Sequence, residues 1–548
     1  MTDSIRAGPG GFAPPARRRH YVWLALIMVL GLALRAGYLN YAIQTPEYTW
    51  EDPDGYIERA RRLVRSGEWR WTFDAATYRI VNRRHALPPG FSVVLSLFLQ
   101  YPGFPLSAQI AFMLLGIASL ALIFELGRLV HSPRAGLIAA AASAVAVHNI
   151  IGVWSASQEG LYVPLILFAF VLVGRATLSN APPWRFLIAG FVFGLAALTR
   201  SMPLFFIVPA AAALVFLAPT RRTGSAWAVA LVAGFLLPTL PYVVALSTHF
   251  GEVALIDTHG SIHQTAVAPG ATAPGVGETA AAIWRSMTAA PLEFVRQCLE
   301  RARTLLHVNG GRILQIYVIT DSYAMAIAWK AAVHAGTDLL VILAATLAAL
   351  GSAICRNPRV AVLWLLWTAV NAGIASVGGF SGARLRAPFE PVLIVLAAAL
   401  VSGGWVRRWR WLPVAAAVTL AIAAAMLPQV PRSLAGWPDY GVEWPSIWKR
   451  EHGRLVGPAG VNIPAFDALA DFTLTREPSA AAQALRTDVQ IRGAGVTLES
   501  RTIAPGESQQ FHIWWPRQGL AFLRIDGRSA DRGTPADLQD FLISVPRP

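Results

Sequence analysis

Charged residues are scarce in this sequence, and their scarcity is the first limit on its fold. Of the 548 residues only 14% are Asp, Glu, Lys or Arg, 55% are hydrophobic, and the mean hydropathy is +0.48. A typical soluble domain carries about 25% charged residues. The composition therefore excludes an ordinary soluble protein and predicts a polytopic membrane protein.

Cysteine is almost absent as well. The two cysteines are Cys298 and Cys355, and the topology derived below places them on opposite sides of a membrane. That separation excludes an intramolecular disulfide, and two cysteines alone cannot build a cysteine-based metal site. No solenoid-type repeat is visible, which excludes the common repeat architectures.

The N-terminal region lacks a clear A-x-A cleavage site, although an arginine-rich start precedes an apolar run at 21–39. This run is nearly long enough to cross about 30 Å of hydrocarbon, so we expect a retained anchor instead of a cleaved signal peptide. Residues 1–20 are rich in Gly, Pro and Arg, and we expect them to form a disordered cytoplasmic N-terminus.

Apolar runs dominate the chain from there to residue 428, and we expect a membrane domain at 21–428. One run, 88–100, is short and begins with two prolines, so its length does not decide whether it crosses the membrane. Eleven other runs are candidate spans: 21–39, 106–127, 134–153, 160–174, 186–199, 203–218, 226–247, 338–354, 360–377, 387–404 and 412–428.

The arginines between the runs decide the topology, because cytoplasmic connections carry the Lys/Arg excess. If 88–100 does not cross, six arginine sets all fall on the N-terminal side. We therefore predict a membrane-dipping helix at 88–100 and outer segments at 40–105, 248–337 and 429–548. Orientation in a bacterial inner membrane, with the N-terminus cytoplasmic, then accounts for much of the net charge of +15, which might otherwise indicate nucleic-acid binding.

The tail at 429–548 is less hydrophobic and contains short alternating stretches. Alternation with turn residues between the stretches is typical of strands. We predict a β-rich periplasmic or extracellular domain, with strands at VTLESRTI (496–503), QFHIWW (510–515), AFLRID (521–526) and FLISV (541–545).

Acidic and basic residues crowd the first outer loop, in WEDPDGYIERARRLVRSGEWRW (50–71). Asp52-Pro53 has the form of a helix N-cap followed by proline, and Ser66-Gly67 supplies a stop. We predict an interfacial helix at 53–65, with its apolar side chains at helical spacing and its arginines on the other face. The simplest interpretation is that Asp52 caps this helix and Asp54 complements its dipole.

Other charged residues are predicted at the same outer face, where the topology makes arginines rarer. A charge near hydrocarbon usually has a partner, although an arginine at a helix end also reaches the interface by snorkelling. Arginines gathered at one face predict an anionic partner such as a phosphate leaving group, whose charge they can stabilise. The carboxylates can accept the proton of an attacking hydroxyl. The residues are Arg35, Arg83, Arg84, His85, Glu159, Arg200, Arg384 and Arg386.

Seven segments carry a resemblance in their order along about 400 residues: EDPDGYIERARRLVRSGEW, RRHALPPGFSVVLSLFL, ELGRLVHSPRAGLIAA, SASQEGLYVPLILF, FGLAALTRSMPLFFIVPA, LIDTHGSIHQTAVAPGA and ARLRAPFEPVLIVLAA. This order resembles the GT-C superfamily of membrane glycosyltransferases. Within it, the chain is similar to the family-39-like branch that includes the protein O-mannosyltransferases and the lipid A aminoarabinose transferase. The tail from 429 lies outside the resemblance.

The resemblance implies a GT-C fold with about eleven spans, outer-face juxtamembrane helices and an added β-rich domain. It also implies inverting transfer of a sugar from a polyprenyl-phosphate donor to a lipid, glycan or protein acceptor. By resemblance, Asp52 or Asp54 is the catalytic base, with Asp52 favoured, and Tyr56 in the same motif is expected to bind substrate. Glu159 matches an acid that orients the acceptor or binds a metal in some members. Positions expected to face the lipid phosphate match Arg84, Arg200, Arg384 and Arg386.

The histidines at 259 and 263 form an H-x-x-x-H spacing that could suggest zinc. No cysteine or further ligand is near, and the segment is glycine-rich, so we expect no metal site. Asp257 and His259 are instead expected to line the cleft. No cofactor is required on this interpretation, although a divalent cation is compatible with it. Glu125 is expected to pair with Arg128 at i+3.

Two alternatives stay open. A transporter or flippase of lipid-linked sugars would place charges near the midplane and show repeated halves, whereas these charges gather at one face and no halves repeat. An enzyme resembling the O-antigen ligases would move a whole glycan from a diphosphate lipid, and the first-loop aspartates would then be dispensable.

Overall fold

The structure is a computed structural model that describes residues 16–44, 56–67, 88–146, 149–150, 158–250, 283–285, 287–305, 327–377, 387–403, 412–426, 449–451, 454–458, 463–465, 469–476, 487–493, 496–504, 506–514, 521–529 and 541–546. The chain divides into two compact units. The first comprises Met1–Leu39, Trp50–Val308 and Thr337–Val430, and the second comprises Asn40–Thr49, Asn309–Gly336 and Pro431–Pro548.

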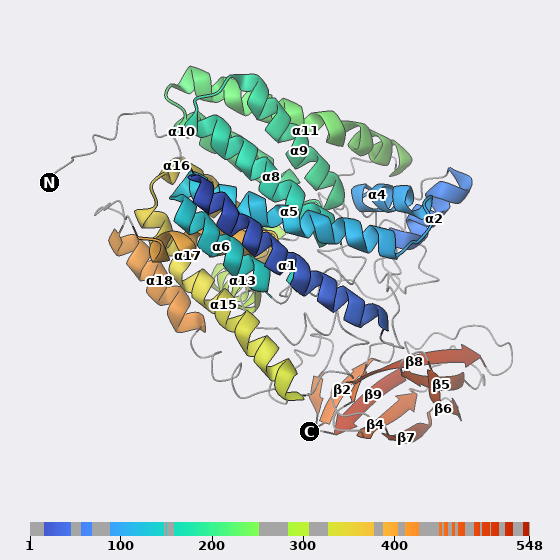
Figure 1. Cartoon of the computed structure of the whole chain (residues 1–548). Helices are drawn as coiled ribbons and strands as arrows, with labels where there is room; N and C mark the ends of the chain where they lie inside the picture. Colours follow the sequence, from blue (N-terminus) through green and yellow to red (C-terminus); the bar gives the residue numbers. More distant parts are fainter. Residues whose placement is uncertain are drawn as a thin grey trace. The chain divides into compact units, whose positions relative to one another are not determined.

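Helices occupy all eleven predicted apolar runs (Figure 1). The largest difference concerns the run at 134–153, whose helix ends at Val145 because Ala146 takes an extended conformation (φ −63°, ψ 116°). The helices are α1 (Arg18–Gln44), α5 (Leu106–Val130), α6 (Pro133–Val145), α8 (Glu159–Leu178), α9 (Pro183–Thr199), α10 (Met202–Leu217), α11 (Arg221–Phe250), α15 (Ile327–Ile354), α16 (Pro358–Val377), α17 (Glu390–Val401) and α18 (Leu412–Met426).

Several of these helices can cross a membrane, which makes this a multi-pass membrane protein. Within the described residues, four stretches are long and apolar enough by length and composition, and eight further apolar helices have 10–17 residues. The four are Arg18–Asn40, Leu106–Val130, Glu159–Leu178 and Arg221–Thr248.

The segments predicted to be extramembrane include the helices α2 (Tyr56–Ser66), α4 (Gly90–Leu99) and α13 (Pro291–Leu305). With ten residues, α4 is about 15 Å long, half the thickness of the hydrocarbon core. This length agrees with the prediction that 88–100 does not cross. The predicted end of the first-loop helix is also confirmed, because Gly67 has φ +67° and its N–H donates to the Leu63 carbonyl at 3.1 Å.

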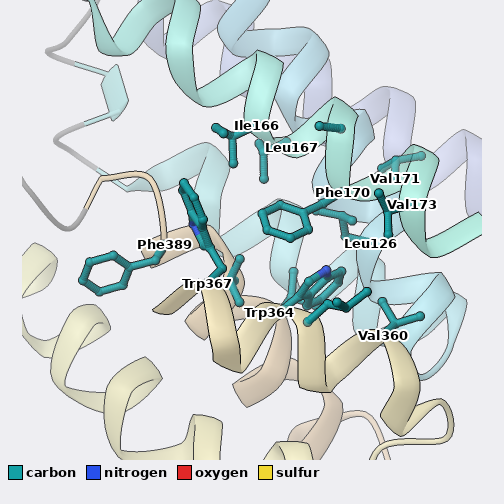
Figure 2. Close-up of a cluster of buried hydrophobic side chains, with 14 of the residues drawn as sticks. Leu126, Ile166, Leu167, Phe170, Val171, Val173, Val360, Trp364, Trp367 and Phe389 are labelled. Atoms are coloured by element: carbon teal, nitrogen blue, oxygen red, sulfur yellow. The ribbon is translucent and has the colours of Figure 1, made fainter. Parts of the chain in front are cut away.

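The helices pack around a cluster of buried aromatic side chains. The ring centroid of Phe170 in α8 lies 5.4 Å from that of Phe193 in α9, 5.7 Å from that of Phe206 in α10 and 5.7 Å from that of Trp367 in α16. Figure 2 shows Phe170 beside Trp364 and Trp367. Rings in tilted or edge-to-face pairs at these distances attract each other beyond their burial, so this cluster fixes α8 against three other helices.

A charged network joins α5 to α8 near the C-terminal end of α5. Arg128 donates to Glu125 through Nε and Nη2, both at 2.6 Å, which confirms the predicted pair. Arg175 at the end of α8 also donates to Glu125, with Nε 2.8 Å from Oε1. Beside it, the Asn357 side chain donates to the Leu129 carbonyl at 2.6 Å. The C-terminal ends of α5 and α8 are therefore held together.

The second unit contains two antiparallel sheets, and the strands predicted at 496–503, 510–515, 521–526 and 541–545 are confirmed as β6, β7, β8 and β9. The sheet orders are β1-β2-β9-β4-β7 and β3-β8-β5-β6. Leu474, Ile503 and Phe511 are fully buried. The strands are β1 (Lys449–Glu451), β2 (Arg454–Pro458), β3 (Ile463–Ala465), β4 (Leu469–Arg476), β5 (Thr487–Gly493), β6 (Val496–Ile503), β7 (Ser508–Trp514), β8 (Ala521–Ser529) and β9 (Phe541–Pro546).

Candidate functional site

Two of the predicted site residues stand at matching ends of neighbouring antiparallel helices. Glu159 is the first residue of α8, and Arg200 follows the last residue of α9 with an extended backbone (φ −153°, ψ 131°). An acidic residue suits the first turn of a helix because it complements the helix dipole. Since the chain runs along α8 and back along α9, the two side chains are brought to the same end of the bundle.

Glu159 and Arg200 form an ion pair. Arg200 Nη1 lies 2.6 Å from Glu159 Oε1, and each side chain is only 11% exposed. The Arg200 guanidinium also lies over the ring of Tyr162, with Cζ 6.0 Å from the ring centroid. Tyr162 follows Glu159 by three residues, so both sit on one face of α8. Two side chains of α8 therefore fix the direction of Arg200.

The guanidinium keeps unused donors. Among the residues that the structure describes, Nη1 is the one guanidinium nitrogen of Arg200 with a hydrogen bond, so Nε and Nη2 make none. Arginine presents its N–H groups as a planar fork that matches the oxygens of a phosphate. A guanidinium already oriented in this way could bind an anion without losing much side-chain freedom.

Tyr56 lies in the same region but its hydroxyl is already engaged. The hydroxyl donates to Gln158 Oε1 at 2.8 Å, and the side chain is 1% exposed. Its ring meets Phe91 of α4 edge to face at 5.1 Å, and Phe91 lies 5.4 Å from Phe112 of α5. The first outer-loop helix is thereby joined to the beginning of α8.

The apolar side of α2 faces protein, which corrects one part of the sequence-based interpretation. Tyr56, Ile57 and Ala60 pack with Phe91 and other side chains of α4 and α5, where an interfacial helix was expected to face lipid. Arg59, which was assigned to the polar face, is only 5% exposed. A helix of eleven residues is stabilised mainly by packing its apolar face against neighbouring helices. The spacing of its apolar residues does not indicate which neighbours cover that face.

Glycine 90 brings α4 against the end of α9. A Cβ at this position would lie 2.8 Å from the Leu198 carbonyl oxygen and 3.0 Å from Thr199 Oγ1, closer than non-bonded atoms usually approach. The sequence L-P-P-G therefore ends in the residue that this contact requires. Because Arg200 follows Thr199 directly, α4 helps to define the position of Arg200.

Arg35 was predicted to have a partner and to bind substrate. It does have partners, since Nη1 donates to the carbonyl of Gly31 at 3.1 Å and to that of Ala144 in α6 at 3.3 Å, and the residue is 2% exposed. Nε has no hydrogen bond within the described part of the chain. The bond to Ala144 joins α1 to α6, and the substrate role of Arg35 stays a prediction.

The remaining predicted residues lie outside the described residues, so their roles also stay predictions. They are Asp52, Asp54, Arg83, Arg84, His85, Asp257, His259, Arg384 and Arg386.

Tyr162 was not predicted to belong to the site, and Gln158 was given no role. Tyr162 could have been found from its i+3 spacing to Glu159, whereas nothing in the sequence indicates a contact between Gln158 and a residue 102 positions earlier. Metal ligands do not gather in the described residues, where no group of three His, Cys, Asp or Glu side chains could hold an ion. Cys298 and Cys355 form no disulfide within the described residues.

Solved proteins with a similar arrangement are archaeal oligosaccharyltransferases from Archaeoglobus fulgidus. One, in complex with an inhibitory peptide and a dolichol-phosphate, is 19% identical, with 76% of this chain and 56% of that chain covered and a TM-score of 0.44. Another, in complex with Zn and sulfate, is 17% identical, with 75% and 52% covered and a TM-score of 0.44. The chain thus spans about half the length of these proteins. No curated protein sequence matches it.

Residues 86–245 match the sequence model of a family described as dolichyl-phosphate-mannose-protein mannosyltransferase. The match runs from the residues just before α4 to α11 and includes Glu159, Arg200 and Gly90, whereas Asp52 and Asp54 precede it. The predicted resemblance to the GT-C membrane glycosyltransferases is thus confirmed, over the segment that contains the Glu159–Arg200 pair.

Proposed function

We propose that the protein is a membrane glycosyltransferase that moves a sugar, with inversion, from a polyprenyl-phosphate donor to an acceptor hydroxyl at the outer face of a bacterial inner membrane. The observation that carries the proposal is the arrangement of Arg200. It lies in the family-matched segment, is largely buried and is held by Glu159, and two of its nitrogens have no hydrogen bond to any described residue. A fixed guanidinium of this kind suits a phosphate leaving group.

The reaction breaks the bond between the anomeric carbon and the phosphate oxygen, and the electron pair stays on that oxygen. Arg200 stabilises the charge that develops there, because its donors are in place before the bond breaks. The acceptor hydroxyl attacks the opposite face of the anomeric carbon, which inverts its configuration. Its proton passes to Asp52 or Asp54, the first-loop acids that act as general base.

Other predicted residues complete the site in this proposal. Arg35, Arg83 and His85 line the donor side, while Asp257 and His259 line the cleft that admits the acceptor. Three further arginines, Arg84, Arg384 and Arg386, share the donor phosphate with Arg200.

Glu159 has a different part from the other acids. Its Oε1 accepts the hydrogen bond from Arg200 at 2.6 Å, so we assign it to the orientation of Arg200 and leave proton transfer to the first loop. If a divalent cation takes part, the first-loop acids and Glu159 are the groups that would hold it. The reaction does not depend on one here, because arginines already supply the positive charge.

Two measurements test this function with the full-length protein. Mass spectrometry of the lipid that co-purifies with the protein is expected to find a polyprenyl monophosphate or its sugar ester. Proteoliposomes are then expected to move radiolabelled sugar from that donor to an acceptor in an envelope extract. Lipid-linked sugar that crosses the bilayer without being consumed would identify a flippase instead.

The general base is tested by Asp52→Asn and Asp54→Asn, alone and together. We expect one single variant and the double variant to lose at least 100-fold in rate, in the range usual for loss of a general base. Glu293→Gln is the matched control, because this exposed carboxylate in α13 is ionised, with the hydrogen bond from Arg296 lowering its pKa to about 2. Full activity of the double variant would refute the mechanism and favour the ligase-like alternative.

A further inference from the structure

A hydrogen bond joins α2 to the residue that precedes α8. Tyr56 in α2 donates its hydroxyl proton to Gln158 Oε1 at 2.8 Å, across 102 residues of sequence. Tyr56 is two residues after Asp54, and Gln158 directly precedes Glu159. The bond therefore links the loop that carries the candidate base to the residue that holds Arg200.

Both partners are fixed on their own sides. The Tyr56 ring is enclosed by the side chains of α4 and α5, including Phe91 and Phe112. Gln158 precedes the first turn of α8, and α8 is held by the aromatic cluster around Phe170. The Tyr56 side chain cannot turn away without loss of packing, so its bond to Gln158 can transmit position to the beginning of α8.

The side chain of Gln158 is not used for a local purpose. It occupies the N-cap position of α8, where Ser, Thr, Asp or Asn usually accepts a hydrogen bond from the helix backbone. Here the backbone is already helical (φ −56°, ψ −23°) and the side chain makes no capping bond. Its carbonyl oxygen instead reaches α2. The Gln158 side chain thus connects α8 to α2 and leaves the N-terminus of α8 without a side-chain cap.

We propose that Tyr56 and Gln158 are a positioning pair that sets the distance between the first-loop aspartates and the Glu159–Arg200 pair. This inference rests on the proposed function. It changes the predicted role of Tyr56 from substrate binding to positioning, since the hydroxyl proton is donated within the protein. Asp54 precedes Tyr56 by two residues and Asp52 by four, so a fixed Tyr56 limits the reach of Asp54 more than that of Asp52.

A positioning pair predicts a specific kinetic pattern. Displacement of a reacting group by about 1 Å costs on the order of 100-fold in rate. Tyr56→Phe keeps the ring and its contact with Phe91 but removes the hydroxyl, and Gln158→Met removes the acceptor at similar length. We expect each variant to lower kcat about 10- to 100-fold while the donor KM changes less than threefold.

The double variant separates positioning from a merely structural role. If the two side chains act through one bond, Tyr56→Phe combined with Gln158→Met lowers kcat no further than the more damaging single variant. Tyr101→Phe, at an exposed tyrosine in the α4–α5 connection, is the matched control and keeps wild-type kinetics. Equal protein yield and monodispersity of all four proteins show that folding is not the cause.

The experiment is steady-state sugar transfer by the full-length protein in proteoliposomes, with the co-purified donor class as substrate. Lower kcat with unchanged KM and no further loss in the double variant supports the pair. Multiplicative losses, an effect on KM alone, or wild-type kcat in both single variants overturns it while leaving the proposed function in place. Absence of transfer by the wild-type protein overturns the function, and the pair falls with it.

Discussion

Replacement of Arg200 by lysine is the sharpest test of the phosphate-binding role. Lysine keeps the positive charge, so an ion pair with Glu159 can still form and the buried carboxylate is not left alone. It lacks the planar fork, however, and one ammonium group cannot reproduce the directions of Nη1, Nη2 and Nε. The substitution thus separates the charge of Arg200 from its geometry.

The magnitude follows from the bonds that are lost. In the structure, Nη1 serves Glu159 and the other two nitrogens have no hydrogen bond within the described residues. Each charge-assisted hydrogen bond to the leaving phosphate contributes about 1.5–3 kcal/mol. Loss of one such bond in the transition state corresponds to a decrease of about 10- to 140-fold in kcat/KM, at 1.4 kcal/mol for each factor of ten.

Initial rates of sugar transfer by the purified full-length protein measure this decrease. Arg185→Lys is the matched control, because Arg185 lies at the opposite end of α9, where its guanidinium is 5.4 Å from the Trp184 ring centroid. Thermal unfolding of the two variants, compared with wild type, reports whether the fold is intact. A kcat/KM for Arg200→Lys within twofold of wild type would refute the assignment of Arg200 to the leaving group.

Three other outcomes are expected. Glu125→Gln removes the carboxylate that two arginines share and should lower the free energy of unfolding by about 1–3 kcal/mol without changing kcat, so an unchanged thermal midpoint would contradict the network's role. Gly90→Ala should lower both stability and kcat, because its Cβ would press on the Leu198 carbonyl, whereas the Cβ of Gly37→Ala would have no atom within 4 Å and this variant should behave as wild type. Excess EDTA should leave the rate within twofold, since Arg200 supplies a fixed cation; a loss that Mg²⁺ or Mn²⁺ restores would show a metal requirement.

The helices were predictable because membrane spans are recorded in the sequence as length and hydrophobicity. The strand β6 was predicted to its bounds from alternation, and the alternation in Leu469–Arg476 could have located β4 as well. The run at 134–153 was predicted as one span, whereas the backbone leaves the helix at Ala146 and is helical again at Asn149 and Ile150. Hydrophobicity alone does not indicate that point.

The proximity of Glu159 to Arg200 was predictable, but their contact was not. Charge parity placed Glu159 and Arg200 at the same face, and α8 and α9 do bring them together. Their pairing across 41 residues depends on how the two helices rotate about their axes, which no local pattern records. The partner of Arg35 was missed for a similar reason, because a carbonyl at the end of α6 carries no signal in the sequence.

The pairing of Glu159 with Arg200 also limits how the acids can divide the chemistry. The Glu159 carboxylate accepts a hydrogen bond from the Arg200 guanidinium at 2.6 Å and stabilises its charge. If Glu159 took the proton of the acceptor, it would lose the negative charge that orients Arg200 while the phosphate is leaving. A base should therefore stand apart from the cation. In the proposed mechanism the proton passes instead to Asp52 or Asp54, which belong to a different segment of the chain, and Arg200 keeps its orientation.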